Sequence, residues 1–237
     1  MRSALLLTIA LACQAQEFEV ATVKQSPPGQ GDLININLGN VQNGTVTLSN
    51  ATLSECLQFA YGLVSAEQVS GPDWIRARSI RYDIVAKTGS GTSGEQIPTM
   101  MQALLADRLK VAVHHEPKVL SYLALSVDKK GAKLGAATSG GNRTAVSGHI
   151  SSKEIPLARL ATLLSRFERQ IIIDETHLTG NYAIELEWTP EHRLAEVPSG
   201  LSLYTALQDQ LGLRLEPRRG PVDAIVVDRA QKIPVEN

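Results

Sequence analysis

The apolar positions of this chain follow two periods, and each period predicts a different element. A spacing of i, i+3, i+4 and i+7 predicts one face of a helix, and Leu53, Cys56, Leu57 and Ala60 have this spacing. Over 182–188 the large apolar residues Tyr182, Ile184, Leu186 and Trp188 alternate with Ala183, Glu185 and Glu187, which predicts a strand with one buried and one solvated face. Helical and strand segments therefore share the chain.

The pattern of the first half recurs in the second half at an offset of about 100 residues. The recurring landmarks are helical runs at 52–57 and 155–160, strands at 81–85 and 181–185, helix ends at 105–111 and 207–213, and strands at 124–129 and 224–229. A fixed spacing of this kind indicates an internal repeat. We therefore expect a tandem duplication.

The expected fold class is α+β, with two tandem βαββαββ-like units and two helices packed on small mixed sheets in each unit. The Asn43-Gly44 turn predicts an added hairpin strand in front of the first unit. In each unit a break is expected to separate the two closing strands, which are predicted at 110–115 and 120–128 in the first unit and at 213–216 and 222–228 in the second. Glu116-Pro117 is the break in the first unit.

Composition sets the expected boundaries. The stretch 131–148 is rich in Gly, Ala, Ser and Thr, which is typical of an interdomain linker. We expect a signal peptide over 1–16, a first repeat with extra N-terminal strands over 17–135, a linker over 136–148 and a second repeat over 149–232.

Local signals place the first helix. Thr52, with Glu55 three residues later, is a capping box in which each side chain accepts a hydrogen bond from the other residue's free backbone amide. Cys56 lies in the apolar stripe that follows, where a cysteine behaves as a small hydrophobe. We interpret Cys56 as a core residue, with a reactive thiol as the alternative.

The N-terminus has the features of an export signal. Arg2 is followed by an apolar run over 4–12 and then by small residues, and the run is too short to span a bilayer. Ala10-Leu11-Ala12-Cys13 also fits a permissive lipobox, so lipidation of Cys13 is an alternative to simple cleavage. The expected location is periplasmic or secreted, with a lipid anchor as the variant.

Charge argues against a nucleic-acid partner. The net charge is −1 and the pI is about 6.5, whereas nucleic-acid binding requires a concentrated basic face. Short basic clusters occur at Arg76, Arg78 and Arg81 and at Arg218 and Arg219. These arginines are either solvated surface or contacts to a protein partner. Trp74, on a loop after Gly71-Pro72, is either a core plug or an interface anchor.

The search for reactive groups predicts no catalytic residue, no metal site and no cofactor. His114 and His115 are adjacent on a predicted strand, so their side chains leave on opposite faces. Ser126 and Lys129 have the Ser-x-x-Lys spacing of penicillin-recognising enzymes, but they lie on a strand end where alternation separates them. We interpret that match as chance.

Two resemblances follow from particular stretches of sequence. Over the whole mature chain the sequence resembles a large uncharacterised family of secreted proteins found mainly in soil acidobacteria, and the matching stretches are 18–24, 50–53, 71–74, 81–84, 104–109, 178–182, 187–190 and 207–217. Some relatives are joined to membrane metallopeptidase sensors of the antibiotic-response type. The resemblance therefore implies a sensory or partner-binding role outside the cell membrane, with a membrane-bound sensor as one candidate partner.

Each repeat also resembles the short N-terminal domain of secretins and TonB-dependent receptors, above all over Ile150 to Val227. The likeness lies in 155–157, 171–174, 178–180 and the helix that ends at 211–213. Such domains bind partner proteins in the periplasm and catalyse nothing, which is what this resemblance implies here.

The expected function is that of an exported, non-enzymatic module that binds an envelope protein through exposed sheet edges or the Trp74 loop. Sheet edges present unpaired amides and carbonyls, so strand addition is an accessible mode of recognition. The alternatives are a hydrolase or redox enzyme with a site between the two repeats, and a small-ligand sensor with an apolar pocket.

Overall fold

The computed structural model describes residues 17–27, 37–138, 144–197 and 199–235. It contains two compact units that are discontinuous in sequence. The described part of the first unit comes from within 1–63, 71–114 and 227–237, and that of the second from 64–70 and 115–226. No helix in the described ranges is long and apolar enough to cross a membrane.

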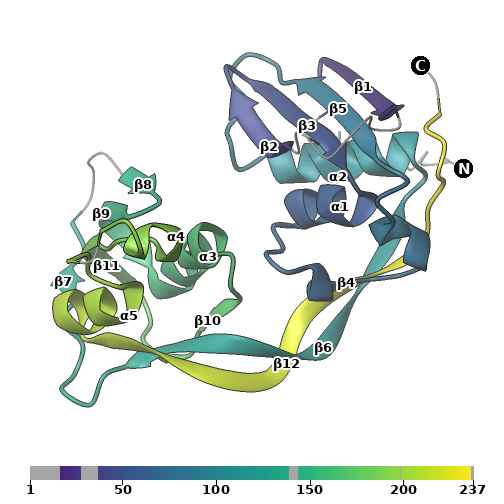
Figure 1. Cartoon of the computed structure of the whole chain (residues 1–237). Coiled ribbons are helices and arrows are strands. Elements are labelled where there is room, and N and C mark those ends of the chain that lie inside the picture. Colours follow the sequence, from purple (N-terminus) through teal and green to yellow (C-terminus); the bar gives the residue numbers. More distant parts are fainter. Residues whose placement is uncertain (1–16, 28–36, 139–143, 198, 236–237) are drawn as a thin grey trace, which may run out of the picture. The chain divides into compact units, whose positions relative to one another are not determined.

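The first unit is built on a four-stranded antiparallel sheet in the order β1-β5-β3-β2 (Figure 1). Its strands are β1 (Val20–Gln25), β2 (Asn37–Gln42), β3 (Thr45–Ala51) and β5 (Tyr82–Lys87). Alternate residues such as Val46, Leu48 and Ile84 are fully buried, while their neighbours Val85 and Lys87 are exposed. The alternation thus gives the sheet one apolar face, which α1 and α2 cover.

The two helices of this unit form where the sequence predicts them. They are α1 (Leu53–Tyr61) and α2 (Ile97–Arg108), and the short turn η2 (Asp73–Arg76) lies between them. The predicted capping box is confirmed, because Glu55 N donates to Thr52 Oγ1 at 3.3 Å and Thr52 N donates to Glu55 Oε2 at 2.8 Å. Cys56 is fully buried, and burial raises the pKa of its thiol far above the ordinary value. The core interpretation of Cys56 is confirmed.

The second unit contains a sheet with the same connectivity. Its order is β7-β11-β9-β8, and its strands are β7 (Gly135–Ala136), β8 (Thr144–Val146), β9 (His149–Pro156) and β11 (Asn181–Glu187). In both units a hairpin leads into a helix, and the next long strand inserts between the hairpin and an outer strand that precedes it in sequence. Here the helix is α3 (Leu157–Glu168), which buries Leu157, Leu160 and Leu164.

A second sheet of this unit has the order β10-β6-β12-β4. Its strands are β4 (Val69–Ser70), β6 (Ala112–Val127), β10 (Ile172–Asp174) and β12 (Leu213–Arg229), and the division between the units falls within β6 and β12. β10 is parallel to β6, and β4 is parallel to β12. The remaining short elements are η1 (Ala66–Gln68), α4 (Glu191–Leu194), α5 (Leu203–Ala206) and the π-turn η3 (Leu207–Leu211).

The α+β class is therefore confirmed, but the closing strands differ from the expectation. β6 runs through Pro117 and β12 runs through Pro217 and Pro221, so each predicted pair of strands is one long strand. Proline is tolerated where its missing amide would face no neighbouring strand. β10 pairs only with Leu123–Leu125 and β4 only with Ile225–Val226, so the prolines lie beyond those paired segments.

The small-residue stretch also differs from the expected linker. Residues 135–136 and 144–146 form β7 and β8, the two outer strands of their sheet. A Cβ on Gly135 would lie 3.1 Å from Ala183 Cβ, so a residue without a side chain allows β7 to approach β11 closely. The hairpin predicted at Asn43-Gly44 is formed by β2 and β3, which pair antiparallel across that turn.

Candidate functional site

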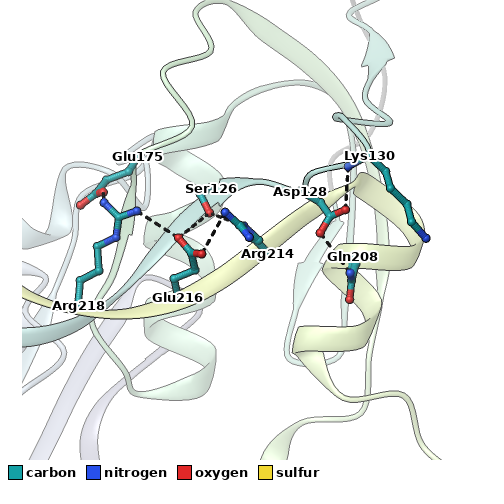
Figure 2. Close-up of polar contacts among 8 residues, drawn as sticks. All are labelled: Ser126, Asp128, Lys130, Glu175, Gln208, Arg214, Glu216 and Arg218. Atoms are coloured by element: carbon teal, nitrogen blue, oxygen red, sulfur yellow. Dashed lines mark hydrogen bonds and ion pairs between the residues drawn. The ribbon is translucent and has the colours of Figure 1, made fainter.

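A group of polar contacts joins side chains of β6 and β12 in the second unit (Figure 2). Arg218 forms ion pairs with Glu175 and with Glu216, the latter at 3.1 Å between Nη2 and Oε2. Arg214 Nη2 lies 3.0 Å from Glu216 Oε1, and Arg214 Nε donates to Ser126 Oγ at 3.3 Å. Two arginines and two carboxylates thus neutralise one another.

These contacts shift the ionisation of the groups involved. The hydrogen bond from Arg218 lowers the pKa of Glu216, and the same contact raises the pKa of Arg218. Tyr122 donates its phenol proton to Glu175 Oε1 at 2.5 Å, and this hydrogen bond raises the pKa of Tyr122. Each pKa shift favours the state in which the contact forms: the ionised form of Glu216 and Arg218 and the neutral form of Tyr122.

Asp128 is a second anchor at the end of β6 (Figure 2). It accepts hydrogen bonds from the Lys130 backbone amide at 3.0 Å and from Gln208 Nε2 at 3.1 Å. The Lys130 hydrogen bond is the main cause that lowers the pKa of Asp128. The side chains in these polar contacts come from β6, β12, η3 and the loop after β10. We interpret the residues labelled in Figure 2, together with Tyr122, as one polar cluster that fixes these segments, named here the staple.

The residues predicted as partner contacts fall into both units. Trp74, Arg76 and Arg78 belong to the first unit, and Arg218 and Arg219 to the second. Arg218 takes part in the staple, while Arg219 is exposed on β12. Cys13 lies outside the described residues, so its lipidation stays a prediction.

The Trp74 loop is partly exposed. Trp74 lies on η2, and Lys232 Nζ lies 5.7 Å from the centroid of its ring, within the range of a cation–π contact. Arg78 pairs with Glu55 at 3.2 Å, although 60% of the Arg78 side chain remains exposed. Arg76 is exposed as well. The loop is thus accessible, but the Trp74 ring is already in contact with the Lys232 ammonium.

A different surface of the first unit is open in a way that the sequence did not reveal. β1 is an outer strand, and Ser26 N donates to Arg81 O at 2.9 Å at the end of its ladder with β5. Backbone groups alternate in direction along an antiparallel strand. From the register, Thr22 and Lys24 therefore face β5, whereas Ala21, Val23 and Gln25 face outward.

The outward edge of β1 borders a groove. Within the ranges that the structure describes, the outward backbone groups of Ala21, Val23 and Gln25 have no hydrogen-bond partner. One cavity of about 420 Å³ lies along 21–25, and an adjoining one of about 380 Å³ lies along 17–21. Ala21 and Arg108 line both cavities, so the two adjoin each other, and together they are named here the β1 groove.

The walls of the β1 groove come from α2 and from the C-terminal segment. Met100, Ala103 and Leu104 of α2 supply apolar wall beside the first residues of β1. Residues 233–235 supply the wall beside the last residues of β1, and Ile233 is 73% exposed. The apolar walls and the free backbone edge together suit an extended peptide.

Hydrogen bonds hold the C-terminal wall in place. Val235 N donates to Arg108 O at 2.8 Å, and Gln231 N donates to Leu109 O at 2.7 Å. Lys232 O accepts from Tyr82 Oη and from Gln25 Nε2, each at 2.9 Å. The groove is thus assembled from three parts of the sequence, which is why no local motif indicated it.

His114 and His115 each contact a carboxylate. His114 Nδ1 lies 2.8 Å from Asp228 Oδ1, and His115 Nδ1 lies 3.0 Å from Asp223 Oδ1. The neighbours on the strand thus have different partners. Among the described residues no group of three or more His, Cys, Asp or Glu side chains has a geometry that could hold a metal ion.

The described fold is that of an α+β protein in which one sheet of each unit has the same strand connectivity, with an open strand edge on the first unit. A family model described as a protein of unknown function, DUF3738, matches residues 54–230. The chain belongs to this family. Neither the curated proteins nor the solved structures gave a significant match.

Proposed function

We propose that the protein is a binding module that takes an extended segment of a partner protein as an added strand on β1. The observation that carries this proposal is the β1 groove, because the groove lies beside backbone amides and carbonyls that have no partner in the described ranges. Strand addition supplies hydrogen bonds to such groups, and the groove gives room for alternate side chains.

The dimensions of β1 set the ligand. The strand has six residues, which corresponds to a length of about 20 Å. Three residues face outward, and each offers one amide and one carbonyl. Each hydrogen bond contributes a net of about 1 kcal/mol, so the backbone alone supports only weak binding. Side chains that enter the groove must supply the rest.

The charges along the groove favour one orientation of the ligand. Glu17 and Glu19 line the part beside the start of β1, where Asp107 is already paired with Arg108 at 3.0 Å, and Lys24 lines the part beside its end. A peptide with a basic residue beside the start of β1, apolar residues in the middle and an acidic residue beside the end of β1 is complementary to these charges. This charge order defines the partner segment that we propose.

The proposed place of action is outside the cytoplasm, with an envelope protein as the partner. Support comes from the sequence features of an export signal, Arg2 followed by the apolar run over 4–12. The tandem duplication is supported by the shared order of the sheets β1-β5-β3-β2 and β7-β11-β9-β8.

The test is to select peptides from a random displayed library with the full chain and then to measure how groove variants bind a selected peptide. Ala21→Trp places a large ring in the groove, whereas Val85→Trp places the same ring on the exposed face of β5, away from the residues that line the groove. We expect Ala21→Trp to abolish peptide binding and Val85→Trp to retain it.

A backbone variant separates strand addition from simple groove filling. Val23→Pro removes an outward amide and leaves the ladder to β5 intact, so peptide affinity is expected to fall while the protein stays folded by circular dichroism. Peptides that bind both Ala21→Trp and Val23→Pro as tightly as the parent chain would refute strand addition at β1.

A further inference from the structure

A small cavity in the second unit has the composition of a ligand site. Its volume is about 100 Å³, and its floor comes from three neighbouring strands through Leu123 of β6, Ile172 of β10 and Leu215 of β12. Leu203 of α5 and Leu194 of α4 complete the apolar wall. An apolar cavity of about 150 Å³ holds benzene, so this one suits a shorter aliphatic chain.

The rim of the cavity is acidic. Glu168 and Glu191 both line it, and none of its lining residues is a Lys, Arg or His. Within the described ranges neither carboxylate forms an ion pair within 4.0 Å. The two acids therefore carry negative charge beside an apolar wall without a compensating cation.

Hydrogen bonds hold both carboxylates in position. Trp188 Nε1 donates to Glu168 Oε1 at 2.6 Å, and the Glu191 backbone amide donates to Glu168 Oε2 at 3.5 Å. Gln170 Nε2 donates to Glu191 Oε2 at 3.4 Å. A carboxylate has about four acceptor positions, so each acid retains capacity for another donor.

An aromatic ring completes the rim. Tyr204 of α5 lines the cavity, and the residue is 48% exposed. Burial, followed by the charges of Glu191 and Glu168, raises the pKa of Tyr204, so the phenol stays neutral. The face of a neutral tyrosine ring attracts cations.

We propose that this cavity binds an alkylammonium group. The short aliphatic chain packs against Leu123, Leu203 and Leu215, and the ammonium donates to Glu168 and Glu191 beside the Tyr204 ring. Either a free amine or the side chain of a lysine has this chemistry. The inference concerns the second unit alone and does not depend on peptide binding at β1.

The test uses the full chain and nuclear magnetic resonance titrations with n-butylammonium, with lysine blocked at both ends, and with n-butanol. The inference expects n-butylammonium to shift the amide signals of Leu203 and Tyr204, and n-butanol of equal chain length to bind at least about tenfold more weakly. Saturation by free amine but not by blocked lysine assigns a free amine, and binding of blocked lysine assigns a lysine side chain.

Variants localise the binding. Glu168→Gln keeps an oxygen that accepts from Trp188, and Glu191→Gln changes an exposed residue, so both are expected to fold and to lose at least about tenfold in affinity. Glu187→Gln, on the exposed face of β11, is the matched control and should bind as the parent does. Equal binding of n-butanol, no response to either cation, or unchanged affinity in both Gln variants would overturn the inference.

Discussion

The two units share a connectivity but differ in the outer strand that precedes each hairpin. In the first unit this strand is β1, with six residues and an open edge beside the β1 groove. In the second unit it is β7, with two residues. Proteins commonly shorten edge strands to prevent unwanted pairing. The outer edge of the second sheet is therefore short, whereas the edge of β1 is long enough to pair with an added strand.

The second helices differ as well. In the first unit α2 is a regular helix of twelve residues. In the second unit the same position holds α5, with four residues, followed by the π-turn η3, with five. The regular helix provides a straight wall for the groove beside β1, and the shorter one leaves Tyr204 at the rim of the small cavity.

The largest expected effect tests whether each unit holds its own core. Leu48→Ala and Leu160→Ala each remove a fully buried side chain, one from each unit, and each is expected to cost about 2–5 kcal/mol of unfolding free energy. The chain has two tryptophans, Trp74 in the first unit and Trp188 in the second. Fluorescence of single-tryptophan forms during urea unfolding therefore reports on each unit.

Leu48→Ala should lower the midpoint seen by Trp74 more than that seen by Trp188, and Leu160→Ala should do the reverse. Equal shifts of the midpoint at both tryptophans in both variants would show one cooperative core and would contradict separate cores in the two units.

A smaller effect is expected at the two glycines that end the helical segments. Gly62 after α1 has a φ of 66° and Gly212 after η3 has a φ of 62°, a region that disfavours a side chain. A Cβ on Gly62 meets no atom within 4 Å, whereas one on Gly212 would overlap the carbonyl oxygen of Gly131. Gly62→Ala should cost about 1 kcal/mol and Gly212→Ala about 3 kcal/mol in urea unfolding.

The order of these two costs is the informative result. Equal destabilisation by Gly62→Ala and Gly212→Ala would contradict the claim that a side chain is more crowded at Gly212 than at Gly62.

The staple gives a pH-dependent prediction without a large change in stability. Because the folded-state pKa of Glu216 is lowered, its stabilising contribution is present above the ordinary carboxyl pKa and is lost as the pH falls through the lowered value. Arg218→Ala removes the main cause, so the Glu216 pKa should rise towards its ordinary value. Carbon NMR titration of the Glu216 carboxyl measures this shift.

Tyr122 provides a control in the same titration series. Glu175→Gln removes the charged acceptor of the phenol, so the Tyr122 pKa should fall towards its ordinary value in an ultraviolet titration. A Glu216 pKa that stays the same in Arg218→Ala would argue against the staple.

The sequence was informative where the signal is local. The Thr52–Glu55 capping box and the buried stripe of α1 lie within ten residues, so short-range hydrogen bonding and periodicity were enough to predict them. Pro117 misled because its effect depends on which neighbouring strand is present, and that is a tertiary property.

The candidate sites were less accessible to sequence reasoning. The idea of sheet-edge binding came from the fold class, but the particular edge did not, because the β1 groove joins β1, α2 and residues 233–235. The acidic rim likewise joins Glu168, Glu191 and Tyr204 from three separate elements. The sequence shows Arg218 and Arg219 only as a basic cluster, whereas in the structure Arg218 forms ion pairs with Glu175 and Glu216.

The most direct test of the central claim is hydrogen exchange along β1, with and without a selected peptide. In the free protein the amides of Ala21, Val23 and Gln25 should exchange faster than those of Thr22 and Lys24, because only the latter two are bonded to β5. Saturating peptide should slow the three outward amides selectively. Equal protection of all five amides in the free protein, or outward amides that remain fast when the peptide is bound, would contradict it.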